Sequence, residues 1–464
     1  MIYYILFFLL FFFSPLSAAE PLVAEKLGEF NKGERILILA PHPDDEVIGC
    51  AGIIQEAIAS GARVKIVYLT NGEHNQFVFI VYKKRVIFRQ KEFISLGEVR
   101  RQESIEAMKL LGIGKDDLIF LGYPDFGTFS IFARYWDTDK PFYSLMTRIS
   151  KVPYKSSISF GSPYVGESII ADLKRVILDY QPQKIFVSHP ADVNVDHKSF
   201  YLFLQIALAD LRGKIQQPQV YPYLIHHVGW PLPRRYHPEL SLAPPKGLSD
   251  SQIEWLEFVL SSEQLAKKRQ AILTYKSQTT SSAFYLLSFA RKNELFGDYP
   301  PIFLNNQPKD KKASYFGFLK MFLDTDFELK EKKEGRLFEE GERVSYALLD
   351  KSLVIKIEKP KNIVRRFSTV SYIFGYNYKS QFSLMPKVRI VTKYNKFKAF
   401  DGKKQISLKG ASLELEPTAL ILKIPLASLG SPDFLLVSVR AYIGKEEESS
   451  SPIYTTGFRR IDIN

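Results

Sequence analysis

Between residues 35 and 230, short runs of β-branched and aromatic residues alternate with segments of helical periodicity. This alternation restricts the fold more than any other feature of the chain, because it is typical of a parallel sheet whose strands are joined by crossover helices. We therefore predict an α/β fold, with a Rossmann-like, mostly parallel sheet and helices on both faces. The predicted strands are Arg35–Ala40, Arg63–Thr70, Asp117–Gly122, Lys184–Ser188 and Val220–His226, and the predicted helices are Glu46–Ser60, Val99–Leu111, Glu167–Tyr180 and His197–Leu211.

Two further helices, Ser249–Lys276 and Ala283–Leu295, are predicted to close this first domain, which we place at residues 33–300. Residues 301–312 mix proline, asparagine and charge and are predicted to be a linker. The chain after them, 313–464, consists of short β-branched segments separated by polar turns, which favours an all-β, β-sandwich-like domain. This domain resembles a carbohydrate-binding module only in its general pattern of short strands and turns, and in no specific motif.

Two long, aromatic-rich insertions interrupt the first domain, at Glu73–Leu96 and Phe126–Gly166. Long loops of this kind often carry function, and we expect them to form walls of a substrate cleft.

The amino terminus indicates export. Its first thirteen residues, MIYYILFFLLFFF, form an unbroken apolar run, and the following SPLSAAE offers small residues for cleavage after Ala18 or Ala19. The run is short for a membrane-spanning helix, so an uncleaved anchor is the lesser alternative. We expect a signal peptide at residues 1–19 and a mature protein in the periplasm, on the cell surface or in the medium.

Cysteine and charge limit the remaining chemistry. Cys50 is the one cysteine among 464 residues, so any metal site must use histidine and carboxylate ligands. The net charge is +13, and residues 351–409 alone hold 15 basic and 2 acidic residues. Such a stretch could bind an acidic glycan or another anionic surface, or it could be a solvated basic face. No nucleic-acid partner is expected of an exported protein.

The segment APHPDDEVIGCAG, Ala40–Gly52, lies where the first predicted strand ends and the first helix begins, which is the ligand-binding edge of an open α/β sheet. His42 and Asp45 are spaced to converge on one divalent ion, and Asp44 stays free to act on water. The fourth strand leads into HPADVNVDH, and its last residue, His197, would reach the same edge. Two histidines and one carboxylate leave an open position, as catalytic zinc sites do.

These motifs resemble the PIG-L/LmbE-like family of zinc-dependent de-N-acetylases. PHPDDE with the following GCxG is similar to the leading signature of that family. The resemblance extends to TNGE (Thr70–Glu73), RRQESIEAMKLLG (Arg100–Gly112), LGYPD (Leu121–Asp125) and HPADVNVDH, and it covers about residues 33–300.

The resemblance implies one Zn²⁺, or another divalent ion, held by His42, Asp45 and His197, with Asp44 as the general base. It also implies Asp196 as a supporting catalytic carboxylate. Shorter family members have a histidine three positions before the last ligand, and that histidine helps to stabilise the tetrahedral intermediate. This chain has Asn194 there, so His189 or His226 could take over that role. The candidate substrate-binding residues are Arg100, Asn194, His189 and His226.

The predicted function is that of an exported metal-dependent amidase that removes an N-acetyl group from a sugar in a glycan or glycoconjugate. The alternative is a glycan-binding protein whose deacetylase-like domain has lost turnover. A nucleotide-binding Rossmann protein is disfavoured because no GxGxxG follows the first strand.

Overall fold

The computed structural model describes residues 25–74, 89–249, 253–306, 343–359, 367–393, 395–443 and 452–464. The predicted signal peptide at 1–19, most of the insertion that begins at Glu73, and the part of the predicted all-β domain before residue 343 lie outside these ranges. Within them, no helix combines the length and the apolar character needed to cross a membrane.

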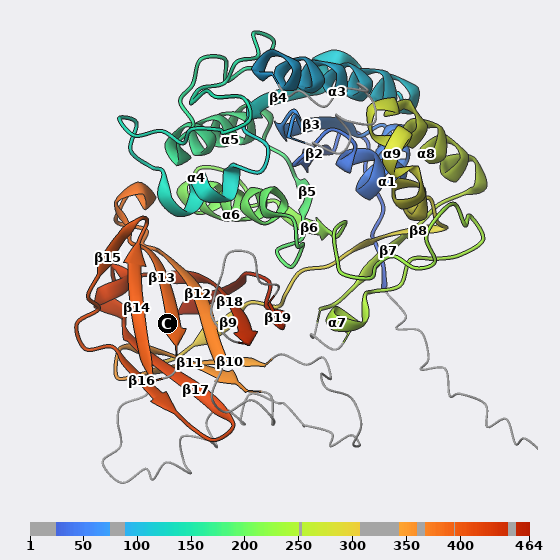
Figure 1. The fold of residues 1–464 in the computed structure, drawn as a ribbon. Coiled ribbons are helices and arrows are strands. Elements are labelled where there is room, and N and C mark those ends of the chain that lie inside the picture. The colour runs from blue at the N-terminus through green and yellow to red at the C-terminus, as the bar shows by residue number, and fades with distance from the viewer. Residues whose placement is uncertain are drawn as a thin grey trace, which may run out of the picture.

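The first unit is built on an eight-stranded sheet with the order β1-β7-β8-β6-β5-β2-β3-β4 (Figure 1). Five neighbouring strands, from β6 to β4, run parallel, and β8 is antiparallel to both of its neighbours. The strands are β1 (Glu25–Lys26), β2 (Arg35–Ala40), β3 (Arg63–Thr70), β4 (Leu118–Tyr123), β5 (Lys184–Ser188), β6 (Gln219–Tyr223), β7 (Leu256–Val259) and β8 (Asn293–Phe296).

Helices cover both faces of this sheet, as predicted (Figure 1). Buried residues alternate along β2: Leu37 and Leu39 belong to the core under one helix layer, and Ile36 and Ile38 to the core under the other. The first layer contains α4 (Thr128–Arg134), α5 (Gly166–Tyr180) and α6 (Val195–Asp210), and the second contains α1 (Asp45–Ala59), α3 (Gln90–Leu111), α8 (Ser262–Thr274) and α9 (Lys276–Leu286), with the short α7 (Lys246–Ser249) nearby.

The two predicted closing helices are partly wrong. Residues predicted as the start of the first one form β7 instead, and α8 begins only at Ser262. Ser261 and Gln264 form a capping box there, which is a stronger start signal than the upstream SDSQ sequence. Likewise, the second predicted helix ends early and its last residues enter β8, because pairing at the sheet edge overrides local helical periodicity.

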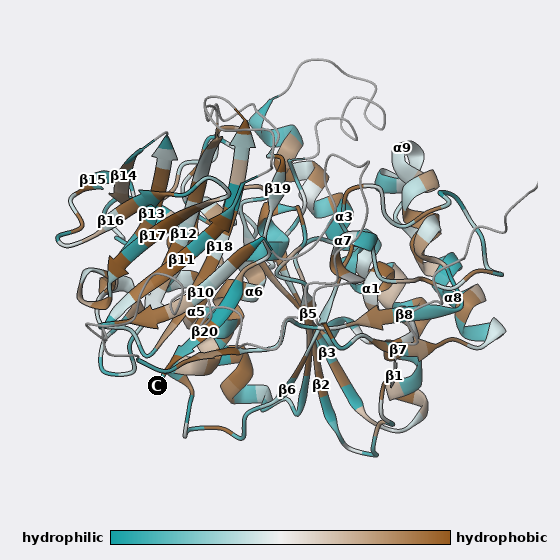
Figure 2. Ribbon diagram, turned by 90° about the horizontal axis from the view of Figure 1, so that it is seen from below, coloured by the Kyte–Doolittle hydropathy of each residue, from teal (hydrophilic) through white to brown (hydrophobic). Residues whose placement is uncertain are grey.

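The second unit is rich in antiparallel strands, as predicted, and forms two packed sheets. Buried residues of both sheets make one core, and strands such as β11, β17 and β18 carry extensive hydrophobic colour in Figure 2. The smaller sheet has the order β10-β11-β17-β16 and the larger β15-β14-β13-β12-β18-β20-β9, with β19 beside β18. The strands are β9 (Ile302–Leu304), β10 (Val344–Leu349), β11 (Ser352–Glu358), β12 (Phe367–Tyr376), β13 (Lys387–Lys393), β14 (Lys396–Asp401), β15 (Lys404–Ile406), β16 (Ser412–Leu415), β17 (Ala419–Pro425), β18 (Phe434–Ile443), β19 (Tyr454–Thr455) and β20 (Arg459–Ile463).

The segment predicted as a linker, 301–312, begins with β9, which pairs in parallel with β20 of the larger sheet. Residues 307–312 of that segment lie outside the described ranges.

The two units share a hydrophobic core. The ring centroid of Phe132 on α4 lies 5.1 Å from that of Phe374 on β12 and 4.9 Å from that of Phe203 on α6. A hydrogen bond of 2.7 Å from the hydroxyl of Tyr376 to Asp210 adds a polar contact. The helix α4, which lies in the second insertion, is therefore buried between the units, and this part of the insertion is not a cleft wall as expected.

Candidate active site

The candidate site lies where the chain order of the strands reverses. From β2 the chain proceeds outward to β3 and β4, and then returns to β5 on the other side of β2. In open α/β sheets such a reversal leaves a crevice at the carboxyl ends of the strands. His42 follows β2 and His197 follows β5, so the loops after two adjacent parallel strands bring the two histidines to one place.

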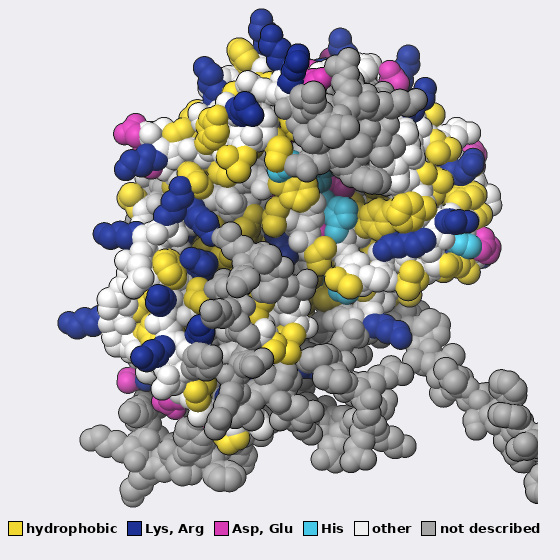
Figure 3. Space-filling model, viewed as in Figure 1, with side chains coloured by type: hydrophobic (Ala, Val, Ile, Leu, Met, Phe, Trp, Pro, Cys, Tyr) yellow, Lys and Arg dark blue, Asp and Glu magenta, His cyan; other side chains and the backbone are white. Residues whose placement is uncertain are grey.

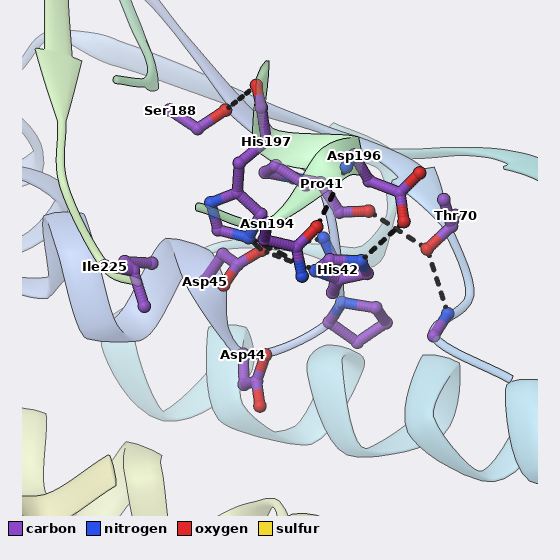
Figure 4. A network of polar contacts seen from close by, with 12 residues as sticks. Pro41, His42, Asp44, Asp45, Thr70, Ser188, Asn194, Asp196, His197 and Ile225 are labelled. Atoms are coloured by element: carbon purple, nitrogen blue, oxygen red, sulfur yellow. Dashed lines mark hydrogen bonds and ion pairs between the residues drawn. The ribbon is translucent and has the colours of Figure 1, made fainter. Parts of the chain in front are cut away.

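All three predicted metal-binding side chains converge there (Figure 4). Oδ2 of Asp45 lies 3.2 Å from Nδ1 of His42 and 3.1 Å from Nε2 of His197, and these two nitrogens are 3.3 Å apart. Ligands about 2.0–2.1 Å from a tetrahedral Zn²⁺ are separated from one another by about 3.3 Å. The three donor atoms therefore fit one face of a zinc coordination tetrahedron, and the remaining vertex would be open.

The electrostatics of this cluster also favour a cation. Burial by itself would lower the pKa of His197, but the carboxylates of Asp192 and Asp45 raise it to about 9. Burial would raise the pKa of Asp45, but His197 and His42 hold it well below its usual range. The buried site thus stabilises positive charge at the point where the three donor atoms meet.

Carboxylates outside this triangle orient both histidines. Oδ2 of Asp192 lies 3.0 Å from Nδ1 of His197, which leaves Nε2 directed at Asp45. On the other side, Nε2 of His42 lies 3.2 Å from Oδ1 of Asp125 and 3.3 Å from Oδ2 of Asp196. Such partners fix the ring orientation and the tautomer of metal-binding histidines.

Asp196 is thus placed behind His42. Its carboxylate accepts hydrogen bonds from the backbone N–H of Phe126 at 2.6 Å and of Thr128 at 3.2 Å, and from the hydroxyl of Thr128. It is fully buried, and with these contacts it ties the loop after β4 to the ring of His42. This placement suits an orienting group.

Asp44 occupies the turn between β2 and α1 with a φ of 118°, a backbone conformation that non-glycine residues rarely adopt. Its side chain is outside the triangle of donor atoms, and Oδ1 lies 3.3 Å from a guanidinium nitrogen of Arg100. Burial raises the pKa of Asp44, Arg100 lowers it and Asp45 raises it, to a net value of about 7. A carboxyl group with this pKa can exchange a proton near neutral pH.

Arg100 is buried and engaged with the backbone. It donates to the carbonyl of Gly72 at 2.8 Å and to that of Pro43 at 2.6 Å, besides its contact with Asp44. Gly72 has a φ of 64°, and a Cβ added there would lie 2.0 Å from the guanidinium. The glycine therefore makes room for Arg100, and Arg100 holds the turn that carries Asp44.

The other candidate substrate-binding residues are placed differently. Asn194 caps α6, accepting the backbone N–H of Asp196 at 2.8 Å. His189 is fully buried and stacked on Trp255, with ring centroids 5.7 Å apart. Of the two candidate histidines, His189 and His226, it is His226 that lies against a predicted metal ligand. Its ring centroid is 4.7 Å from that of His197.

His226 also has a defined charge state. Its Nδ1 lies 3.3 Å from the hydroxyl of Tyr285, and burial lowers its pKa to about 4, although Asp192 opposes this shift. The ring is therefore neutral at neutral pH, and it can donate or accept a hydrogen bond beside the donor triangle.

Sequence reasoning did not identify the roles of Asp192, Asp125 and Glu73. Each belongs to a motif that follows a strand, which is the signal that could have found them. Glu73 accepts the backbone N–H of Asp125 at 3.1 Å, and burial followed by the charge of Asp125 raises its pKa to about 8. A protonated Glu73 therefore supports Asp125, which in turn faces His42.

Comparison with known proteins gives a family match for the part of the chain that carries this site. Residues 37–208 match the family model PIG-L, described as GlcNAc-PI de-N-acetylase. None of the curated proteins compared with the chain matches it.

The solved structures that match this chain have low sequence identity to it. N,N'-diacetylchitobiose deacetylase from Pyrococcus horikoshii is 19% identical and covers 57% of this chain and 82% of its own, with a TM-score of 0.34. The conserved protein TT1542 from Thermus thermophilus is 22% identical and covers 53% and 80%, with a TM-score of 0.32. A 4-carboxy-2-hydroxymuconate hydratase from Pseudomonas putida KT2440 is 15% identical and covers 58% and 98%, with a TM-score of 0.34.

Proposed function

Because residues 37–208 are a domain of the PIG-L family, we propose that this chain is a metal-dependent hydrolase that removes the acetyl group from an N-acetylated sugar. The observation that carries the proposal is the triangle formed by His42, Asp45 and His197, whose edges of 3.1–3.3 Å match the face of a zinc tetrahedron. A divalent ion bound there, which we propose to be Zn²⁺, supplies a Lewis acid for amide hydrolysis.

The residues of the chain provide the proton transfers. Asp44 is the proposed general base: it lies beside the triangle, is not one of its three members, and has a pKa near the pH at which proton transfer is most effective. Arg100 positions it through the contact of 3.3 Å and through the carbonyl of Pro43. The proton accepted by Asp44 can then be returned to the departing amine.

His226 is the proposed hydrogen-bond donor to the oxygen of the reacting carbonyl. It lies against His197 and is neutral, so Nε2 can donate in the tautomer that leaves Nδ1 without a proton. In that tautomer the hydroxyl of Tyr285 turns from the carbonyl of Ile225, 2.8 Å away, to Nδ1, 3.3 Å away. The side-chain oxygen of Asn194 accepts the backbone N–H of Asp196 at 2.8 Å, so Nδ2 is the one group of this side chain that is able to donate to the carbonyl oxygen.

The test is release of free amine from a panel of N-acetylated sugars and glycoconjugates by the zinc-loaded protein. We expect turnover by the wild type, and a loss of at least ~100-fold in kcat for Asp44→Asn with metal content unchanged. The matched control is Asp172→Asn. It makes the same change in a different carboxylate, which accepts a hydrogen bond from the hydroxyl of Tyr123. Absence of turnover from zinc-loaded wild-type protein across the panel would favour the glycan-binding alternative.

We also propose that the protein is exported, with residues 1–19 as a cleaved signal peptide. The support is the apolar run and the small residues after it. Cell fractionation and amino-terminal sequencing test this. A mature chain that still begins at Met1 would contradict cleavage.

A further inference from the structure

A groove of about 1000 Å³ opens between the two units, and its walls come from α5, the end of α6 and the segment after β12. Its position separates it from the candidate active site. Asp210 in the groove and His197 in the active site lie at opposite ends of α6, thirteen residues or about 20 Å apart at 1.5 Å per residue. The groove is therefore a feature that the proposed hydrolysis does not use.

The groove presents aromatic rings to solvent. Tyr378 is 40% exposed, and Trp136 lies deeper, 5.0 Å from the ring of Phe382. The guanidinium of Arg212 lies over one face of the Tyr378 ring, 4.7 Å from its centroid, so a sugar ring would pack on the opposite face. The C–H face of a sugar ring can pack on an exposed aromatic ring whose hydroxyl edge remains polar. Ser380, Gln381 and Ser383 add hydrogen-bonding groups along the same wall.

The charge of the groove is positive. The carboxylate of Asp210 is neutralised, because it accepts hydrogen bonds from Lys174 at 2.8 Å and from Tyr376 at 2.7 Å. Three exposed basic side chains, Arg212, Lys214 and Lys379, form no ion pair within the described chain, and Glu167 is the one other acidic residue of the lining.

In the basic stretch 351–409, Lys387 is buried and Arg389 lies over the ring of Phe400, and Lys379 is the one basic member that lines the groove among the described residues. On the face shown in Figure 3, Lys and Arg side chains are scattered over the surface of both units and do not form one continuous patch. Lys396, Lys398 and Lys404 on β14 and β15 are exposed as well, but they do not line the groove.

We propose that this groove is a binding site for an anionic oligosaccharide, with Tyr378 packing on a sugar ring and Arg212 and Lys379 binding its acidic groups. Arginine binds carboxylate and sulfate groups through paired N–H donors, which suits this class of ligand. The site would hold the enzyme on a charged glycan while the active site acts elsewhere on it.

The test is calorimetric titration in 50 mM salt with four probes: trigalacturonate, its methyl ester, a heparin-derived tetrasaccharide and tripolyphosphate. We expect at least one of the two anionic sugars to bind at least tenfold more tightly than both the uncharged ester and the sugar-free anion. The double variant R212Q/K379Q should weaken that binding at least tenfold, and Tyr378→Ala at least fivefold.

Matched controls come from α8, where Arg269 lies 4.9 Å from the ring centroid of Tyr236. The variants K267Q/R269Q and Tyr236→Ala remove the same charge and the same type of ring, and should bind like the wild type. Unfolding temperatures confirm that all variants are folded.

Three results would overturn the proposal: binding of neither anionic sugar, equal losses in the α8 variants, or tripolyphosphate binding as tight as sugar binding and insensitive to Tyr378→Ala. The Asp44→Asn protein should bind like the wild type, so the outcome is independent of whether the proposed hydrolysis is observed.

Discussion

Oδ2 of Asp192 lies 3.0 Å from Nδ1 of His197 and also accepts the backbone N–H of His226 at 2.9 Å. One carboxylate thus orients a proposed metal ligand and the proposed carbonyl donor together. Burial would raise the pKa of Asp192, but the neighbouring histidines and these hydrogen bonds hold it at about 2, so the carboxylate stays charged.

Asp192→Asn should lower zinc affinity by about 10–100-fold, because the amide keeps the size of the side chain but loses the charge that orients His197. Competition with a chromogenic chelator measures this affinity. Asp210→Asn at the other end of α6 is the control and should bind zinc like the wild type. Equal affinity of the wild type and the Asp192 variant would show that His197 needs no such partner.

Arg100→Gln should reduce kcat by about tenfold or more and leave KM and zinc content nearly unchanged, because Arg100 positions Asp44 and contacts none of the three donor atoms. Steady-state kinetics on the substrate found in the panel, together with metal analysis, separate these quantities. A rise in KM with kcat unchanged would instead assign Arg100 to substrate binding.

Gly72→Ala should abolish most activity, because the added Cβ would lie 2.0 Å from the Arg100 guanidinium at a position with positive φ. Gly33→Ala is the matched control: its φ is 79°, and nothing lies within 4 Å of the added Cβ. Both variants should lose about 1–2 kcal/mol of stability from the backbone conformation, and only the first should lose activity. Comparable activities of the two variants would contradict the role given to Gly72.

Phe374→Ala should destabilise both units in one unfolding transition, by about 3–5 kcal/mol, because the ring belongs to the core that the units share. Ile373→Ala, whose side chain faces the core between the two sheets of the second unit, should lower the same single transition, because the two units unfold together. Calorimetry and circular dichroism would show the transitions. Two well-separated transitions in the wild type would mean that the units fold independently.

The buried amine of Lys387 should make the stability of the folded protein depend on pH. Burial lowers the pKa of its amine from 10.5 to about 7, although Asp401 and Glu167 oppose the shift. Between these two values the unfolded chain holds a proton that the folded protein has released, so stability rises with pH by up to about 1.4 kcal/mol per unit.

The stability difference between the wild type and Lys387→Met should therefore shift in favour of the wild type from pH 7 to pH 9.5. Denaturant titrations at four pH values measure it. A difference that does not change with pH would show that the buried amine keeps its proton.

The positions of the site residues in the chain decide which of them could be predicted from the sequence. His42 and Asp45 are local to one strand–helix turn, and His197 follows another strand, so the rule that parallel strands end at one edge is enough to bring the three together. The roles of Asp125 and Asp192 could not be found in this way. An aspartate after a strand is common, and only the packed fold shows which ring it faces.

The sequence by itself determined the parallel sheet, the change to antiparallel strands after residue 310 and the three donor residues, because each depends on a local pattern of alternation or spacing. The tertiary structure alone decided that α4 is buried against β12, that Asp196 faces His42, and that the end of α6 meets Tyr378 in a basic groove. These relations join residues about 150 to 240 positions apart, and they are set by close packing between elements, which no local pattern encodes.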